Sequence, residues 1–415
     1  MPVSGEELAN RLKVARENAG LTQQQVAEAI GIPRTAIVQI EAAKRVVNSL
    51  ELSRLALLLG RGIGELVGES PFREDPVGAL LRAAPGFSQP PQLEADLRRF
   101  ANLAREATNL EELLGLKTSR PAIVRYELDP PSARWEAVRQ GKMLAIEERK
   151  RLGLGDSPVW EITEIVRGQG VRATEADMPA DISGLFFHRP DTGAVIVVDR
   201  HDVLARRLFS YAHEYCHCLA DRDRAGTVSR RGSDELIEVR ANAFAAHFLM
   251  PEGGVRSFLR TVSGKGEPTR QNQEIFGGEN AVAVQQRAQP ASQDLQIHDI
   301  VRLAHHFGVS YDAALFHLLN LNLLTRERFD LLRAQSATAK SVRRALQIPE
   351  IDGDAHWTLA EQVLGLALEA HRRSLISRRK VVELAAEAGV VRKVIEEAMM
   401  EEGTEEEPVE PVFPE

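Results

Sequence analysis

Residues 212–217 read Ala-His-Glu-Tyr-Cys-His, which places Glu214 directly after His213 and a second histidine, His217, four positions on. The apolar run before them, residues 203–211, predicts a helix. On a helix, histidines at i and i+4 lie one turn apart on the same face. That spacing allows two imidazoles to bind one Zn²⁺ at about 2.0–2.1 Å each. In this motif the glutamate is the general base that deprotonates a metal-bound water. The stretch therefore predicts a zinc site carried on a helix.

A catalytic zinc usually has a third protein ligand and one open position. Residues 234–251 have a helical pattern, and Glu238 lies beside its apolar side. A helix packed against the first could bring this carboxylate to the metal, although Glu238 could also be a solvated surface residue. Asn242, one turn further on, could accept the outer N–H of a ligand histidine and fix its tautomer. Three other side chains remain competing ligands: Asp234, Glu235 and His247.

The two segments together resemble the ImmA/IrrE family of bacterial metallopeptidases. The resemblance lies in His213-Glu-x-x-His217 followed by Glu238-x-x-Ala241-Asn242-x-Phe244-Ala245-Ala246-x-x-Leu249-Met250-Pro251. It implies that His213, His217 and Glu238 bind zinc and that Glu214 is the base. It also implies that the substrate is a repressor-type protein. The sequence departs from the family at Cys216, where Gly or Ala is usual.

Composition limits the class of protein. A chain of 415 residues should hold two or three domains, and its 43% hydrophobic content is ordinary for a globular protein. No apolar run is long enough to span a bilayer and the first residues do not resemble a signal peptide, so we expect a cytoplasmic protein without a membrane partner. Cys216 and Cys218 should point to different faces of a helix and stay reduced. Residues 396–415 contain nine glutamates and no basic residue, which predicts an acidic, disordered tail.

The first 68 residues contain a second pattern, made of five short helical segments. The predicted helices span 6–18, 22–30, 33–41, 49–59 and 63–67. Thr22 and Gln25 form a capping-box arrangement at the start of the second helix. Pro33 stands at the favoured first position of the third helix. Two helices joined by a short turn that contains Gly31 are typical of a helix-turn-helix.

This segment resembles the Xre family of phage-repressor (Cro/C1-type) domains. The resemblance lies in Leu21-Thr22-Gln23, Ala27, Gly31-Ile32, Ile37, Ile40-Glu41 and Lys44-Arg45, with Ala42-Ala43 where the family has Gly. It implies that the third helix enters the major groove of an operator. The implied base-reading residues are Arg34, Thr35 and Gln39, and the implied backbone contacts are Gln23, Lys44 and Arg45. It also implies a homodimer on paired half-sites.

The charge of the helix-turn-helix segment predicts a weak non-specific affinity for DNA. Residues 1–70 contain eight basic and eight acidic side chains. Attraction to phosphate should therefore be weak, so that binding depends on dimerisation and base contacts. The alternative is that the helix-turn-helix serves as a protein-docking surface.

The remaining patterns complete the predicted organisation. The expected fold is mainly α with a small β-sheet (α+β). Residues 1–68 form the helix-turn-helix domain, and 69–132 form a linker with a helical connector over 93–114. A zincin-like metallopeptidase domain over 133–325 includes short strands at 170–173, 182–187 and 194–198 and a flexible loop at 263–294. A helical region over 326–395 precedes the acidic tail. Residues 182–188 are predicted to be an edge strand that holds substrate by strand addition.

The sequence thus predicts a DNA-binding regulator with a zinc endopeptidase domain. Its expected partners are operator DNA and a protein substrate, which would be a repressor or its own chain, and its expected role is control of a stress, mobile-element or defence operon. Two alternatives stay open. The peptidase-like domain could be a ligand or metal sensor in a non-proteolytic transcription factor, or the chain could be an antitoxin-type protein that binds a partner.

Overall fold

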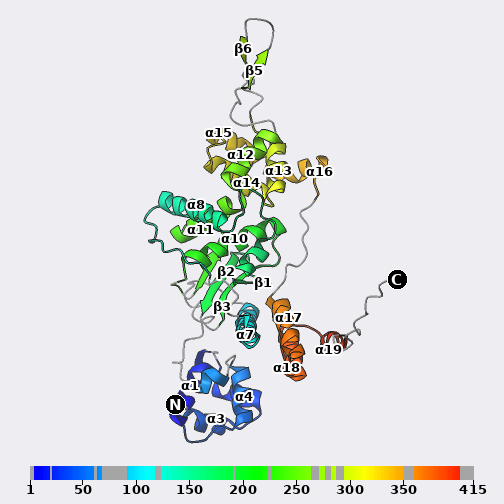
Figure 1. Ribbon diagram of the computed structural model, residues 1–415. Coiled ribbons are helices and arrows are strands. Elements are labelled where there is room, and N and C mark those ends of the chain that lie inside the picture. The colour runs from blue at the N-terminus through cyan, green and yellow to red at the C-terminus, as the bar shows by residue number, and fades with distance from the viewer. Residues whose placement is uncertain are drawn as a thin grey trace, which may run out of the picture.

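The computed structural model describes residues 4–18, 21–59, 63–67, 91–116, 123–189, 192–222, 224, 226–262, 271–275, 282–286, 294–349 and 359–401. Across these ranges the protein is mainly α, with a small four-stranded mixed sheet and a separate two-stranded sheet, which agrees with the predicted α+β class (Figure 1). No helix in them is long and apolar enough to cross a bilayer. Residues 69–90 of the predicted linker and connector (69–132) and most of the acidic tail lie outside the described residues.

Five helices at the N-terminus pack around a core of their own. They are α1 (Gly5–Asn18), α2 (Gln23–Ile30), α3 (Arg34–Glu41), α4 (Ser49–Leu58) and α5 (Ile63–Val67). The capping box of Thr22 and Gln25 begins α2, and Gly31 ends it at a φ of 75°, where a glycine avoids steric strain. Pro33 is the N-cap of α3, so its predicted place inside the helix is wrong by one residue. Buried Ile37 and Ile40 turn the opposite face of α3 towards solvent.

A four-stranded sheet lies in the middle of the chain. Its strands are β1 (Arg172–Ala176), β2 (Ile182–Arg189), β3 (Gly193–Asp199) and β4 (Gly226–Arg230), in the order β1-β3-β2-β4. β1 runs parallel to β3, and the other pairs are antiparallel. The prediction of an edge strand at 182–188 is wrong, because β2 lies between β3 and β4. β4, which the sequence did not predict, forms that edge.

Side chains alternate along β3 and give the sheet two apolar faces. On one face Ala194, Ile196 and Val198 join the larger core with α9 (Ile162–Gly168) and α10 (Leu204–Ala220). Two further helices lie over α10 on that side, α11 (Leu236–Leu249) and α8 (Arg134–Arg151). The helix that carries residues 212–217 is therefore held between the sheet and another helix.

The opposite face of the sheet is covered from outside the expected 133–325 unit. Val195 and Val197 pack there with α7 (Pro91–Leu113) and α17 (Leu359–Arg372). The apolar stripe of α7, which includes Leu97 and Phe100, is buried in this second core. The predicted connector and the predicted C-terminal region thus close the back of the sheet.

The other helices extend these two cores. α12 (Glu252–Thr261), α13 (Ile297–His306), α14 (Tyr311–Asn320) and α15 (Arg326–Ala334) contribute to the first, and the short helix η3 (Ser336–Thr338) and α16 (Ala339–Ala345) follow. α18 (Arg378–Glu387) packs against α17, and α19 (Arg392–Glu401) packs against α18. α19 continues to Glu401, so residues 396–401 are helical and not part of a disordered tail. Within the predicted loop at 263–294, β5 (Gln271–Ile275) and β6 (Val282–Gln286) pair as antiparallel strands.

Candidate functional site

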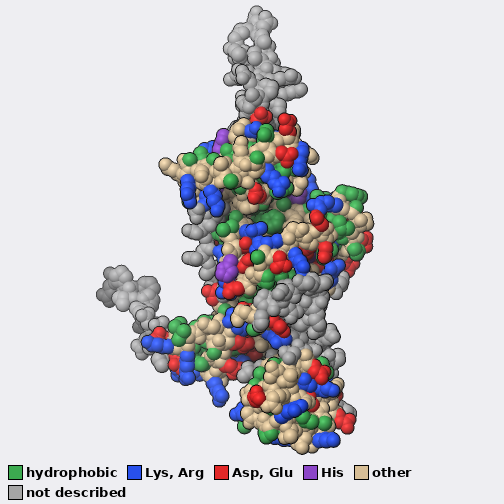
Figure 2. Space-filling view, turned by 180° about the vertical axis from the view of Figure 1, so that it is seen from behind, with side chains coloured by type: hydrophobic (Ala, Val, Ile, Leu, Met, Phe, Trp, Pro, Cys, Tyr) green, Lys and Arg blue, Asp and Glu red, His purple; other side chains and the backbone are tan. Residues whose placement is uncertain are grey.

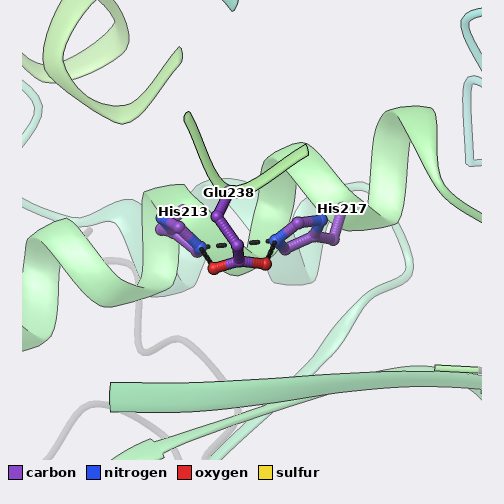
Figure 3. A group of neighbouring side chains, drawn as sticks. All are labelled: His213, His217 and Glu238. Atoms are coloured by element: carbon purple, nitrogen blue, oxygen red, sulfur yellow. Dashed lines mark hydrogen bonds and ion pairs between the residues drawn. The ribbon is translucent and has the colours of Figure 1, made fainter. Parts of the chain in front are cut away.

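Three side chains from two helices meet at one point. His213 and His217 project from successive turns of α10, and Glu238 reaches them from α11, with its carboxylate between the two rings (Figure 3). The Nε2 atom of His213 lies 3.1 Å from Oε2 of Glu238, and that of His217 lies 3.1 Å from Oε1. All three side chains are buried. They are the metal-ligand cluster found among the described residues.

The separations within this cluster fit a bound metal. The two Nε2 atoms are 3.3 Å apart. Two nitrogens bound to one zinc at about 2.0–2.1 Å and a tetrahedral angle of about 109° would also be roughly 3.3 Å apart. The donor set of two imidazoles and one carboxylate is that of known catalytic zinc sites, which keep a fourth position open. The residues present therefore fit a tetrahedral cation.

Each histidine is held from its outer nitrogen. Nδ1 of His213 lies 3.0 Å from Oδ1 of Asn242, one turn beyond Glu238. Nδ1 of His217 lies 2.8 Å from Oδ2 of Asp221, whose other oxygen accepts a hydrogen bond from buried Arg240. Such contacts leave Nε2 free to bind a cation and fix the direction of the ring. The sequence pointed to Asn242 but missed Asp221 and Arg240.

The ionisation of the cluster reflects these contacts. Burial lowers the pKa of His217, but the hydrogen bonds to Asp221 and Glu238 outweigh it and raise that pKa to about 10. Burial raises the pKa of Glu238, yet the hydrogen bonds to both histidines hold it well below its usual range. Negative charge thus predominates among the neighbours of the two imidazoles, as a cation-binding centre requires.

Glu214 is fully buried beside the cluster. Neither carboxylate oxygen accepts a hydrogen bond of standard geometry from a described residue. Burial raises the pKa of Glu214, the two histidines lower it, Glu238 raises it and the Ser229 hydroxyl lowers it. A Cβ placed on Gly184 of β2 would stand 2.7 Å from Oε1 of Glu214. The carboxylate therefore occupies space that only a glycine on the sheet leaves open.

The two residues inside the His-Glu-x-x-His stretch hold α10 in place. The Tyr215 hydroxyl donates to Oε1 of Glu148 on α8, and its ring packs edge-on against Phe244 and Phe248 of α11. Cys216 and Cys218 are both buried and free. These contacts fix the rotation of α10 and therefore the direction of both histidines.

The competing ligands lie elsewhere. Asp234 is exposed and pairs with Arg134 at 2.9 Å, and Glu235 is exposed. His247 packs against His317 of α14 with ring centroids 4.7 Å apart. None of these three side chains belongs to the cluster of His213, His217 and Glu238.

The second candidate site is the exposed face of α3. Arg34, Thr35 and Gln39 all lie on this face, together with Val38, which is 42% exposed and was not singled out in the sequence. This polar face is available to a groove of DNA because Ile37 and Ile40 hold the other side of the helix in the core.

The three residues predicted to contact the DNA backbone differ in whether their side chains are free. Gln23 donates to Glu41 at 2.9 Å, and Arg16 pairs with the same carboxylate at 2.6 Å. Arg45 pairs with Glu51 at 2.6 Å, whereas Lys44 is exposed. Two of the three side chains are thus engaged within the domain itself.

Comparison with known proteins agrees with both parts of the fold. Residues 12–66 match the helix-turn-helix family model, and residues 167–319 match the model of the IrrE N-terminal-like domain, a metallopeptidase family. The chain is therefore a helix-turn-helix protein fused to a metallopeptidase-family domain. It is a DNA-binding transcriptional regulator with a peptidase-like domain, as the two resemblances implied.

Whole-chain comparisons add little to this. No curated protein matches the chain. ComR from Streptococcus suis shares 11% identity and covers 96% of this chain and 93% of its own, with a TM-score of 0.16. PlcR from Bacillus thuringiensis, solved in complex with the peptide PapR7 and DNA, also shares 11% identity, covering 96% of this chain and 98% of its own, with a TM-score of 0.14. Scores this low do not establish a shared arrangement.

Proposed function

We propose that this regulator is a zinc-dependent endopeptidase that controls an operon by cutting a repressor-type protein or its own chain. The observation that supports this most directly is the Glu214 carboxylate. It is fully buried beside a cluster that fits a metal, and neither of its oxygens accepts a hydrogen bond of standard geometry from a described residue. An unpartnered buried carboxylate costs stability unless a ligand or water uses it. A general base meets this condition, because its carboxylate interacts with the attacking water.

The residues divide the work of peptide hydrolysis. His213, His217 and Glu238 would hold Zn²⁺, and Asn242 and Asp221 would orient the two histidines. The ion, when bound, supplies an acidified water and polarises the scissile carbonyl. Glu214 accepts the proton of the attacking water and passes it to the leaving amine. The raised pKa of Glu214, caused by burial, makes it a stronger base than an exposed glutamate.

At the other end of the chain, α3 would read the operator. Arg34, Thr35 and Gln39 would contact base edges, and Lys44 the phosphate backbone, while the contacts of Gln23 and Arg45 would require them to leave Glu41 and Glu51. A homodimer would place two such helices on paired half-sites. Operator binding by α3 and cleavage of the repressor-type protein would then control the same promoter.

A second candidate function is supported by the burial of the centre. His213 is 6%, Glu214 0% and Glu238 5% exposed, so little of the site meets solvent. A buried centre suits a sensor that binds a metal ion or small ligand without cutting a protein. The base Glu214 would then have no chemical task.

Replacing Glu214 separates the two functions. Glu214→Gln should keep the zinc, because the three ligands are unchanged, but it removes the base. Cells with wild type or variant would be compared by mass spectrometry of protein fragments and by promoter activity. Loss of a specific fragment together with the transcriptional response supports cleavage. An unchanged response with no differing fragment would favour the sensor.

A further inference from the structure

The turn between α17 and α18 carries a concentration of positive charge that neither the metal cluster nor α3 uses. Residues 371–380 read His-Arg-Arg-Ser-Leu-Ile-Ser-Arg-Arg-Lys, with five basic and no acidic side chains. We propose that this basic turn, through Arg378 and Arg379, binds phosphates of the DNA that flanks the site read by α3. The inference rests on the operator binding proposed above and adds a second contact surface to it.

Within the basic turn the free charge is concentrated on two residues. Arg372 and Arg373 both donate to Glu369, and Lys380 pairs with Glu106 at 3.3 Å and with Glu383 at 3.2 Å. Arg378 and Arg379 are exposed, and neither makes an ion pair with any residue that the structure describes. Their guanidinium groups are therefore available to an external anion.

The position of these arginines points to DNA. They line a cavity of about 1160 Å³ whose other wall includes Ser53 and Ala56 of α4 and Ile63 of α5. The lining also contains four glutamates and two further arginines: Glu106, Glu383, Glu387, Glu396, Arg105 and Arg392. Figure 1 shows α18 beside α4, at the level of the helix-turn-helix domain. Figure 2 shows Lys and Arg side chains, together with Asp and Glu side chains, on the C-terminal helices next to this domain. The free cations thus lie on the flank of the part that reads DNA.

The charge of the helix-turn-helix domain explains why a second surface is needed. Its segment holds as many acidic as basic residues, eight of each in residues 1–70. Arg16 and Arg45, two of those bases, are committed to Glu41 and Glu51. Affinity for duplex DNA comes largely from phosphate contacts. Arginine is suited to them because its planar group can bind a phosphate through two parallel hydrogen bonds.

The test is the salt dependence of binding by the full-length protein. The probe is a duplex selected by the wild-type chain from a random-sequence library, with affinity measured by fluorescence anisotropy between about 50 and 200 mM salt. Each lost phosphate contact reduces the slope of log affinity against log salt by about 0.9, so Arg378→Ala/Arg379→Ala should reduce it by about 1.8. The loss of DNA affinity in the variant, relative to wild type, should then become roughly tenfold smaller as salt rises across that range.

A matched control removes the same charge elsewhere. Lys340 and Arg344 are exposed on α16, at the end of the molecule away from the helix-turn-helix domain (Figure 1). Lys340→Ala/Arg344→Ala should leave the slope unchanged. The effect of the Arg378/Arg379 variant should also be equal for the selected duplex and an unrelated one, because phosphates carry no base identity.

The outcomes separate the two proposals. A wild-type slope in the Arg378/Arg379 variant overturns the basic turn as a DNA contact, and an acidic protein would then be its better partner. If Arg34→Ala still loses sequence preference in that case, operator reading by α3 stands. If the wild-type chain selects no sequence and binds no duplex, both proposals fail together.

Discussion

Nδ1 of His217 donates a hydrogen bond to Oδ2 of Asp221, the C-cap residue of the same helix, and the two atoms are 2.8 Å apart. Removing this contact should free the ring to turn. Asp221→Ala should weaken zinc binding by about 10–100-fold, as outer contacts of ligand histidines usually do. Competition with a chelator would measure the change.

Asp221→Asn provides the control for that variant. Its amide oxygen can still accept from Nδ1, so it should recover part of the affinity. Arg240, which is 2% exposed and pairs with Asp221, loses a charge partner in both variants. Equal zinc affinity in wild type and Asp221→Ala would show that Asp221 only balances Arg240.

Metal analysis tests the ligand set. Purified protein should contain about one zinc per chain. His213→Ala should lose it, because two protein ligands cannot hold the ion tightly. His247→Ala and Asp234→Ala should retain it, since both side chains lie outside the cluster. Zinc loss from either of these two variants would mean that the ligand assignment is wrong.

Gly141 marks the closest approach of α8 to α11. A Cβ there would stand 2.3 Å from the carbonyl oxygen of Arg240 and 2.8 Å from the amide nitrogen of Phe244, which are backbone atoms that cannot turn aside. Gly141→Ala should therefore lower the free energy of unfolding by about 1–3 kcal/mol or more. Gly365, exposed in α17 with nothing within 4 Å, is the matched control. Gly365→Ala should raise stability by roughly 0.5–1 kcal/mol, and thermal or urea unfolding would distinguish the two.

Two buried histidines predict a loss of stability in acid. Burial, and then the charge of the neighbouring histidine, lower the pKa of His247 to about 3, and burial lowers that of His317 to about 4. An unfolded histidine has a pKa of about 6.5. Above that pH both states are neutral and stability is complete. Below it the unfolded chain gains protons that the folded chain does not, so stability falls as the pH drops from about 6.5 towards 4 and 3.

Comparison with His247→Gln/His317→Gln isolates this effect. Over the same pH range the variant should lose less stability than the wild type, because each histidine contributes about 1.4 kcal/mol per pH unit. Other titrating groups, the metal ligands included, cancel in the difference. Parallel curves for the two proteins would rule the pair out as the cause.

The exposed face of α3 predicts where sequence preference resides. Arg34→Ala and Gln39→Ala should each reduce discrimination between operator and unrelated DNA by about 1–3 kcal/mol, because each removes a base contact. Lys13→Ala removes an exposed charge from α1 and should leave discrimination unchanged. Competition binding measures this ratio directly. If all three variants discriminate like the wild type, the domain is better explained as a protein-docking surface.

Local patterns predicted the elements that carry the candidate sites. The spacing of His213 and His217 needs only one helix, and Glu238 and Asn242 needed only a second helix packed against it. Asp221 was also within reach, since it follows His217 by four residues. The capping box of Thr22 was correct because it depends on neighbours in sequence.

Long-range pairing could not be predicted in this way. β4 is short and rich in Thr, Ser and Arg, and it becomes a strand by pairing with β2. The sequence predicted helices in the regions of α7 and α17, but it did not predict that both pack on the back of the sheet. That packing joins α17 to strand residues more than a hundred positions earlier in the chain. An apolar stripe shows that a helix is buried and does not show what buries it.

The meeting of α7 and α17 on the sheet restricts where self-cleavage could matter. α7 and α17 pack against each other, so non-covalent contacts hold an N-terminal and a C-terminal part of the chain together. A nick between α12 and α13 would leave two fragments that travel together through a sizing column, with the helix-turn-helix still attached to the rest. Only a cut between α5 and α7 would separate the helix-turn-helix domain from the rest of the protein. A self-inactivating peptidase of this design would have to cut there.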